Sequence, residues 1–313
     1  MADKKLKQTD KRYHENIFKK TINSILVGII IAISHLPFWI LFGISDFIYI
    51  IVRYVVKYRY KVIIENLSNA FPDKNKTEIK KITNKFYHHF CDLFVETIKS
   101  YSINSAEMSK RMKFNNIDIL NDHFDKGKSV VLLGMHYNNW EWNSSMPIKC
   151  KHQVSVVYNP LRGNNAFEKF ILKTRTRWGC KMIPVNQTRR IVLDIAKAKI
   201  PVALALGADQ TAPATSKFWT PFFNREAPFF SGPEKIAHSL ELPVFFTYSR
   251  KVKRGMYEVD YILLFENPKE VDPNEILLTY IRKIEELVSE EPAYYLWSHR
   301  RWKHTRPEGT PLL

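Results

Sequence analysis

The segment Val130-Val-Leu-Leu-Gly-Met-His136-Tyr-Asn-Asn-Trp-Glu141-Trp142 decides the fold, because an apolar run stops abruptly at a histidine. Ser129 to Met135 has the composition of a short buried β-strand, and the Tyr-Asn-Asn-Trp stretch can turn into a helix. Open α/β sheets bind ligands in the crevice outside the carboxyl ends of their strands. We therefore expect His136 to lie at the edge of such a crevice.

Glu141 follows His136 by five positions and is the predicted partner of the histidine. An imidazole titrates near pH ~6.5, so it can take a proton from a hydroxyl near neutrality if a carboxylate fixes its tautomer and stabilises the imidazolium. No serine or cysteine nucleophile stands beside the pair, which favours activation of a substrate hydroxyl over a covalent enzyme intermediate. The alternative is a structural polar pair at a strand end, because this spacing is common by chance.

The rest of the chain predicts an α/β fold with a mainly parallel central sheet flanked by helices and preceded by a hydrophobic membrane anchor. Upstream of the first strand, residues 59–70 and 77–100 have the pattern of an amphipathic helical hairpin. Downstream, strands and helices alternate. We expect strands at 154–158, 181–185, 201–207, 242–250 and 257–264, and helices at 166–177 and 190–199.

Cysteine usage indicates a reducing compartment. The three cysteines, Cys91, Cys150 and Cys180, are odd in number and lack the spacing of a structural zinc site. His88, His89, Cys91 and Asp92 superficially resemble a metal cluster, but adjacent histidines on a helix point in different directions. We therefore expect helix-surface residues there, and neither a metal site nor a cofactor.

The chain is strongly basic, with a formal net charge of +17. Such an excess suggests nucleic acid, anionic lipid headgroups or an acidic partner protein. The sequence has no zinc-finger spacing, no RNA-recognition aromatic signature and no basic leucine zipper, so we do not expect nucleic-acid binding. With the N-terminal tail at +4 and the apolar segment at −1 set aside, residues 53–313 carry +14, enough to face an anionic membrane surface directly.

Residues 22–52 form the predicted membrane anchor, between a basic tail at 1–21 and a large α/β domain at 53–313. The stretch is apolar apart from Asp46, is broken at Pro37, and exceeds the roughly 20 residues that a span needs. Basic residues flank both ends, which the positive-inside rule allows for a shallow hairpin bent at Pro37, whereas a single tilted span would leave one basic flank outside. Both topologies stay open, beside a buried hairpin of a soluble protein.

Several motifs match one family in the same order. The chain resembles the late acyltransferases of lipid A biosynthesis, the lauroyl and myristoyl transferases within the glycerolipid acyltransferase superfamily. The resemblance covers nearly the whole chain and rests on residues 66–72 (Asn-Leu-Ser-Asn-Ala-Phe-Pro), the His136 to Glu141 motif, residues 158–161 and 175–177, residues 208–210 (Ala-Asp-Gln), residues 221–223, and 297–303 (Trp-Ser-His-Arg-Arg-Trp-Lys) followed by Arg306-Pro307.

The resemblance implies transfer of an acyl chain from the thioester of acyl carrier protein, or of coenzyme A, to a hydroxyl of a membrane-embedded glycolipid precursor. It also implies a bacterial inner-membrane protein whose catalytic domain faces the cytoplasm. His136 would take the hydroxyl proton while Glu141 orients the ring. The oxyanion needs a donor, and Arg175, Arg177 or backbone amides near the end of the first strand are candidates. The same arginines, with Arg162, suit substrate phosphates.

Two further groups are predicted to take part in binding. Asp209 follows the strand at 201–207, so it should approach the same crevice as His136 and hold an arginine or a sugar hydroxyl. Arg300, Arg301 and Trp302 are candidates for contact with an anionic headgroup or the membrane interface, or they close the fold.

The acceptor is the open part of the prediction. Asn224 stands where family members often carry glycine, and Asn159 stands where an arginine is expected, with Arg162 nearby. A changed headgroup, such as a lysophospholipid, a glycosylated phosphoinositide or an amino-acid lipid, is therefore an alternative. A more remote alternative is a non-catalytic, membrane-tethered basic binding protein, which leaves the placement of His136 and Glu141 unexplained.

Overall fold

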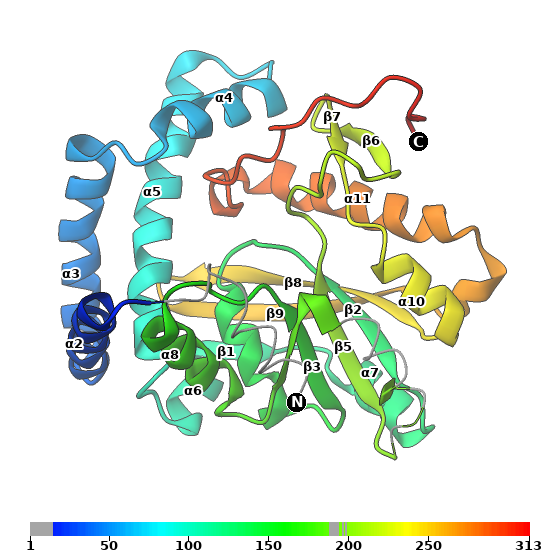
Figure 1. The fold of residues 1–313 in the computed structure, drawn as a ribbon, viewed down its shortest axis with the longest axis horizontal. Helices are drawn as coiled ribbons and strands as arrows, with labels where there is room; N and C mark the ends of the chain where they lie inside the picture. The colour runs from blue at the N-terminus through cyan, green and yellow to red at the C-terminus, as the bar shows by residue number, and fades with distance from the viewer. Residues whose placement is uncertain (1–14, 188–193, 196, 198) are drawn as a thin grey trace.

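A mainly parallel seven-stranded sheet flanked by helices forms the centre of the molecule, as the sequence predicts (Figure 1). The structure is a computed structural model that describes residues 15–187, 194, 195, 197 and 199–313. The strand order is β1-β9-β8-β2-β5-β3-β4, and only the pairing of β8 with β9 is antiparallel within this sheet. The strands are β1 Met112–Phe114, β2 Val130–Gly134, β3 Gln153–Tyr158, β4 Lys181–Pro184, β5 Val202–Gly207, β8 Val244–Lys253 and β9 Met256–Phe265.

Helices cover both faces of the sheet. The predicted hairpin at 59–70 and 77–100 is confirmed as α4 and α5, and the helix predicted at 166–177 as α8; the one at 190–199 falls largely outside the described residues. The helices are α2 Ile17–Ser34, α3 Phe38–Ile50, α4 Tyr60–Ala70, α5 Lys76–Lys99, α6 Ser105–Arg111, α7 Asp118–Asp125, α8 Asn165–Thr176, α10 Pro233–Leu240 and α11 Pro273–Glu290.

Strand β2 is buried on both faces, which explains its uninterrupted apolar run. Val131 and Leu133 point into a core shared with α4, α5, α10 and α11, while Val130 and Leu132 point into a second core formed with α6, α7 and the 3-10 helix η3, Trp140–Ile148. Side chains alternate between the faces of a strand, so a strand inside a parallel sheet needs apolar residues at every position.

The neighbours of β2 determine what meets at its carboxyl end. Strand β2 pairs with β5 on one side, with Gly134 opposite Gly207, and with β8 on the other. The segments that follow β2 and β5 therefore leave the sheet side by side. This adjacency places residues 136–141 next to residues 208–210.

A short antiparallel hairpin explains the asparagine at position 224. Strands β6 Trp219–Phe222 and β7 Arg225–Pro228 are joined by Phe223 and Asn224, both with positive φ, at 46° and 62°. Two-residue hairpin turns favour this left-handed geometry, which asparagine tolerates better than most residues other than glycine. Asn224 therefore serves the turn as glycine would.

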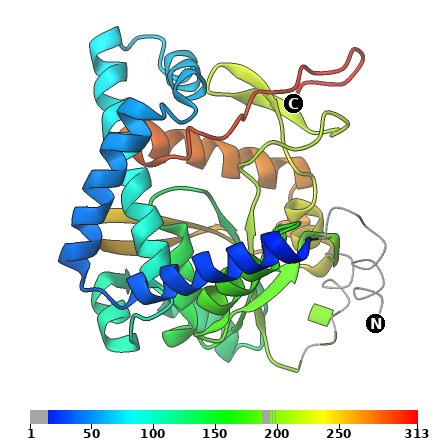
Figure 2. The same cartoon turned by 60° about the vertical axis from the view of Figure 1, so that its left-hand side comes forward.

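The predicted anchor forms two helices separated by a break at His35–Pro37. Helix α2 lies against α8, and α3 lies along α5, continued by a π-helical turn at Ile51–Val55 (Figure 2). Both are long and apolar enough to cross a membrane, and little of either is buried in the protein. Large apolar side chains are exposed along them: Ile17, Phe18, Ile25, Leu26, Ile29, Trp39, Phe47 and Ile50.

Candidate functional site

His136 and Asp209 form the centre of the candidate site. The ring Nδ1 lies 2.8 Å from Asp209 Oδ1, and the backbone N–H of His136 donates to Asp209 Oδ2 over 2.9 Å. Asp209 is buried, whereas the histidine side chain remains 26% exposed. The carboxylate thus contacts its partner through both oxygens and fixes the ring while one side of the imidazole stays accessible.

The second ring nitrogen faces outward. Because Nδ1 donates to the carboxylate, Nε2 carries the lone pair, and it lies 3.1 Å from the side-chain amide nitrogen of Gln210. Trp140 stacks edge-on against the ring, with centroids 5.3 Å apart. The imidazole is therefore in the tautomer that a general base needs, with Nε2 available to a hydroxyl that replaces Gln210.

Glu141 has a different partner from the predicted one. Its carboxylate accepts two hydrogen bonds from Arg175, over 2.8 Å from Nε and 2.6 Å from Nη2, and a third from the Trp140 indole over 3.1 Å. The ring of His136 is instead held by Asp209, so the prediction that Glu141 orients the ring is wrong. The physical reason is the strand order: β5 lies beside β2, so Asp209 reaches Nδ1 of the ring, while Glu141 is engaged by Arg175.

The charges of the site are mutually stabilised. Burial lowers the pKa of His136, but the negative charges of Asp209 and Glu141 outweigh burial and hold this pKa above its ordinary value. Burial raises the pKa of Asp209 and of Glu141, yet His136 in the first case and Arg175 in the second bring both below their ordinary values. The two carboxylates are therefore ionised at neutral pH, beside a histidine of increased basicity.

Close packing fixes the ring against β5. A Cβ atom added at Gly207 would lie 3.4 Å from His136 Cε1, at van der Waals contact. Alanine would just touch the ring, and a longer side chain would push it away from Asp209. The Tyr280 hydroxyl, on α11, donates to the carbonyl of Gly134 over 2.6 Å and accepts from the backbone N–H of Ala208. These two hydrogen bonds link the ends of β2 and β5.

The C-terminal segment makes hydrogen bonds to both segments of the candidate site. The N–H of Leu296 donates to the carbonyl of His136, and the Tyr295 hydroxyl to the carbonyl of Asp209. The amide of Thr211 donates to His299 Nε2 over 3.0 Å. Tyr295, Leu296 and His299 therefore connect the two segments of the candidate site, with His299 alone of the three belonging to the Trp-Ser-His-Arg-Arg-Trp motif.

Arg301 does not reach a membrane or a headgroup, so that prediction is wrong. Its side chain is 2% exposed, donates to the carbonyl of Pro228 over 2.9 Å, and lies over the ring of Phe229 at 4.0 Å. Trp302 is partly buried and stacks on Phe222, whereas Arg300 is exposed. A pair of arginines between two tryptophans indicates an interface, but here one arginine faces the interior.

The three predicted arginines differ in their surroundings. Arg177 donates to the carbonyl of Ser100 over 2.5 Å at the end of α5, and Arg162 is exposed on the loop before α8. Arg175 is joined to the site through Glu141.

The polar residues on α5 are not on the surface. His89, Cys91 and Asp92 are 3%, 1% and 0% exposed, so the expectation of surface residues is wrong for these three. Among residues 15–187, 194, 195, 197 and 199–313, no group of three or more histidine, cysteine, aspartate or glutamate side chains is arranged to hold a metal.

Comparison with known proteins gives one consistent result. Residues 8–304 match the family described as bacterial lipid A biosynthesis acyltransferase. The chain is similar to the lipid A biosynthesis palmitoleoyltransferase of Escherichia coli (strain K12), at 24% identity over 92% of each chain. It is also similar to the lipid A biosynthesis lauroyltransferase of the same organism, at 22% identity over 91% of this chain and 92% of the relative. A lipid A biosynthesis acyltransferase of Shigella flexneri is similar at 24% identity.

Proposed function

The chain belongs to the bacterial lipid A biosynthesis acyltransferase family and is an acyltransferase, and from this premise we propose that it moves a fatty acyl chain from the thioester of acyl carrier protein to a hydroxyl of a lipid A precursor. The observation that carries the proposal is the His136–Asp209 pair at the carboxyl ends of β2 and β5. Among the described residues, the ring contacts Asp209, Gln210 and Trp140 and no serine or cysteine nucleophile, which suits activation of a substrate hydroxyl.

In the proposed reaction, His136 Nε2 removes the proton of the acceptor hydroxyl as that oxygen attacks the thioester carbonyl. Asp209 stabilises the imidazolium that forms, and the tetrahedral intermediate then collapses with cleavage of the C–S bond. The imidazolium returns the proton to the departing thiolate. The products are an ester and a free thiol, and His136 ends the cycle neutral.

Arg175 is the proposed donor to the oxyanion. The backbone N–H groups of His136, Tyr137 and Asn138 all donate within the described part of the chain, so these amides are already occupied. Arg175 uses Nε and Nη2 on Glu141, while Nη1 donates to no group that the structure describes. A guanidinium fixed by a bidentate contact can keep such a donor in place through the reaction.

The proposed acyl donor, acyl carrier protein, is inferred from the net positive charge of the large domain. Residues 53–313 carry +14, and acyl carrier protein is strongly acidic, so electrostatic attraction would increase their association rate. Coenzyme A thioesters present the same reacting group without an acidic protein surface. Assaying both donors separates the two cases.

We further propose that α2 and α3 lie in one leaflet on the cytoplasmic side of the inner membrane. Asp46, near the middle of α3, pairs with Arg254 at 2.6 Å and with His88 at 3.0 Å, and these three side chains are 50%, 31% and 42% exposed. A spanning α3 would carry these charged groups and the packed face of α5 into hydrocarbon, at a cost of several kcal/mol. Helices lying flat would bury their exposed apolar faces in lipid and leave both basic flanks in the cytoplasm.

Acyl transfer by the purified full-length protein in detergent tests the proposal. The protein is mixed with acyl-loaded carrier protein and a lipid A precursor, and the product is followed by mass spectrometry, with His136→Ala as the control. A gain equal to one acyl chain that the variant lacks supports the proposal. Acylation of a lysophospholipid or another non-lipid A acceptor alone would overturn it.

A further inference from the structure

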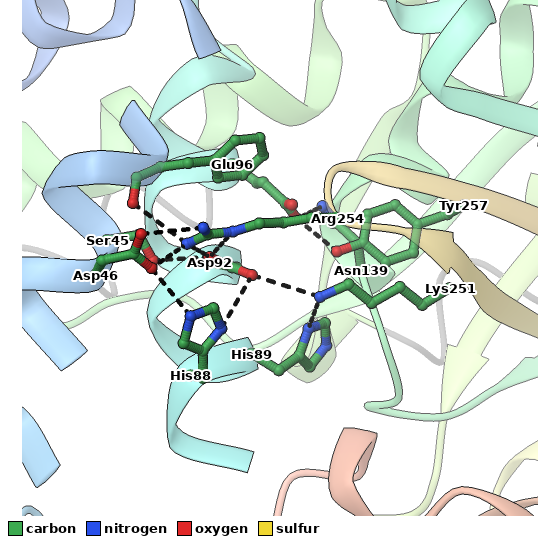
Figure 3. Close-up of polar contacts among 11 residues, drawn as sticks. Ser45, Asp46, His88, His89, Asp92, Glu96, Asn139, Lys251, Arg254 and Tyr257 are labelled. Atoms are coloured by element: carbon green, nitrogen blue, oxygen red, sulfur yellow. Dashed lines mark hydrogen bonds and ion pairs between the residues drawn. The ribbon is translucent and has the colours of Figure 1, made fainter. Parts of the chain in front are cut away.

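Figure 3 shows a group of polar side chains where α5 meets α3, the β8–β9 hairpin and the turn after β2, with Asp92 and Glu96 fully buried among them. The group has two parts. Asp92 faces the anchor: it is fully buried and contacts Arg254 at 2.6 Å and the hydroxyl of Ser45 at 2.8 Å. Glu96, one helical turn further along α5, faces the turn that carries His136.

Glu96 contacts both ends of the segment around Glu141. Its Oε2 accepts from the Asn139 side-chain amide over 2.7 Å and from the Tyr257 hydroxyl over 2.8 Å. Its backbone carbonyl accepts from the Trp142 indole over 3.1 Å. The side chain is fully buried, so these contacts are shielded from water and strengthened by a low local dielectric.

Asn139 connects Glu96 to the backbone of the turn. Its Nδ2 is held by Glu96, and its Oδ1 accepts from the backbone N–H of Trp142 over 3.0 Å, which caps η3. The preceding residue, Asn138, has a left-handed backbone with φ of 51°, which asparagine tolerates, and its side-chain amide donates to the carbonyl of Ser249 over 2.7 Å. Glu96 holds the next residue, Asn139, from outside the turn.

We propose that Glu96 is a positioning residue for acyl transfer, which holds the Asn139 amide and thereby keeps the turn that carries His136 and Glu141 in its reactive arrangement. The inference rests on the proposed function, because the reaction is the one in which those two residues act. Nothing in it requires Glu96 to touch the substrate.

Stability alone does not account for a glutamate at this position. A buried carboxyl group, protonated or ionised, carries a desolvation cost that an apolar side chain of similar size avoids, and replacing buried polar or charged groups by well-packed apolar ones is often neutral or stabilising. Glu96 Oε1 has no hydrogen-bond partner among the described residues, so only one of the two oxygens is compensated by contacts. The contact to the turn therefore gives the residue a role that methionine would not fill.

Steady-state kinetics of three variants test the proposal. Glu96→Met keeps the length but removes the acceptor, and we expect kcat to fall about 10–100-fold with KM within about threefold, as for a small displacement of reacting groups. Glu96→Gln keeps a carbonyl oxygen for Asn139 and should recover kcat to within about threefold. Glu234→Met is the matched control: Glu234 is 1% exposed and accepts two hydrogen bonds at the start of α10, so its loss should lower the melting temperature and leave kcat unchanged.

Asn139→Ser isolates the link between the two residues. Serine still caps a helix, but it is too short to reach Glu96, so we expect a kcat loss of similar size. In the double variant Glu96→Met/Asn139→Ser, the loss should match the larger single effect, and a product of the two losses would overturn the proposal. If Glu96→Met does not fold, Asn139→Ser decides alone: an unchanged kcat contradicts the inference.

Failure of the inference and failure of the proposed function give different results. Release of free thiol from acyl carrier protein is followed together with the lipid product, because thiol release does not depend on which acceptor is used. Normal thiol release by Glu96→Met overturns the role of Glu96 while the wild-type activity stands. Wild-type thiol release without acylated lipid A would instead overturn the proposed acceptor, and the Glu96 comparison would proceed on thiol release.

Discussion

Replacement of Asp209 by asparagine is the most direct test of how His136 is activated. The change keeps the size of the side chain and removes a negative charge 2.8 Å from Nδ1. At an effective dielectric constant of about 20, unit charges at this distance attract by about 6 kcal/mol. Burial of the imidazole persists in the variant without the main compensating charge, so the pKa of His136 should fall below its ordinary value.

The assay is kcat/KM for acyl transfer between pH 5 and pH 9. In the wild type, activity should be lost as pH falls through a pKa above 6.5, because the base must be neutral and Asp209 holds its pKa up. In Asp209→Asn the acid limb should move to lower pH, and the plateau should fall about 10²–10⁴-fold, since the imidazolium loses its partner. A variant that keeps both the limb and the rate within about threefold would refute the reasoning. Glu141→Gln is the comparison, because a larger shift there would restore Glu141 as the partner of the ring.

Four further results are expected. Arg175→Lys should lower kcat about 10–100-fold in the transfer assay, because an ammonium group cannot reproduce the bidentate contact to Glu141; an unaffected kcat would remove Arg175 from the reaction. The kcat/KM for acyl carrier protein should fall steeply between 50 and 300 mM salt while that for acyl coenzyme A changes less, and equal slopes would argue against electrostatic docking. Trp39→Ser should weaken binding to anionic liposomes about tenfold in a sedimentation assay, because this side chain is 75% exposed on α3; unchanged binding would exclude this face. Burial raises the pKa of Glu96 to about 8, so the folded state keeps this proton at pH values where the unfolded state has lost it. Wild-type stability relative to Glu96→Gln in urea unfolding should therefore decline as pH rises from 5 to 8, by up to about 1.4 kcal/mol per pH unit, and should level off above pH 8.

The sequence predicted the site as far as strand ends can reveal it. The apolar run that stops at His136 identified β2, and the run that stops at Gly207 brought Asp209 to the same crevice. The pairing of the two residues was missed, because it depends on β5 lying directly beside β2, and residues 130–134 and 202–207 are separated by two other strands in the chain. The order in which strands lie side by side in a parallel sheet leaves no local pattern in the sequence.

Burial of charged residues was the other source of error. Arg301 and Asp92 were interpreted from the composition of their neighbours, which indicates a surface in both cases. Their burial is sustained by partners far away in the chain, the carbonyl of Pro228 for Arg301 and Arg254 for Asp92. Asn224 shows the reverse situation, since its departure from the usual glycine is explained by the local left-handed turn alone.

The narrow space between Gly207 and the imidazole has a consequence for tracing the ancestry of this enzyme. Because a side chain longer than alanine at this position would displace the ring, a lineage that accumulates larger residues there would have lost catalysis while it kept the fold. On the proposed mechanism, Gly207 and Asp209 are therefore the two positions to inspect when active descendants are sought in a genome. Substitution of glycine at position 207 would be the first change to make when acyltransferase activity is to be restored to such an inactive relative.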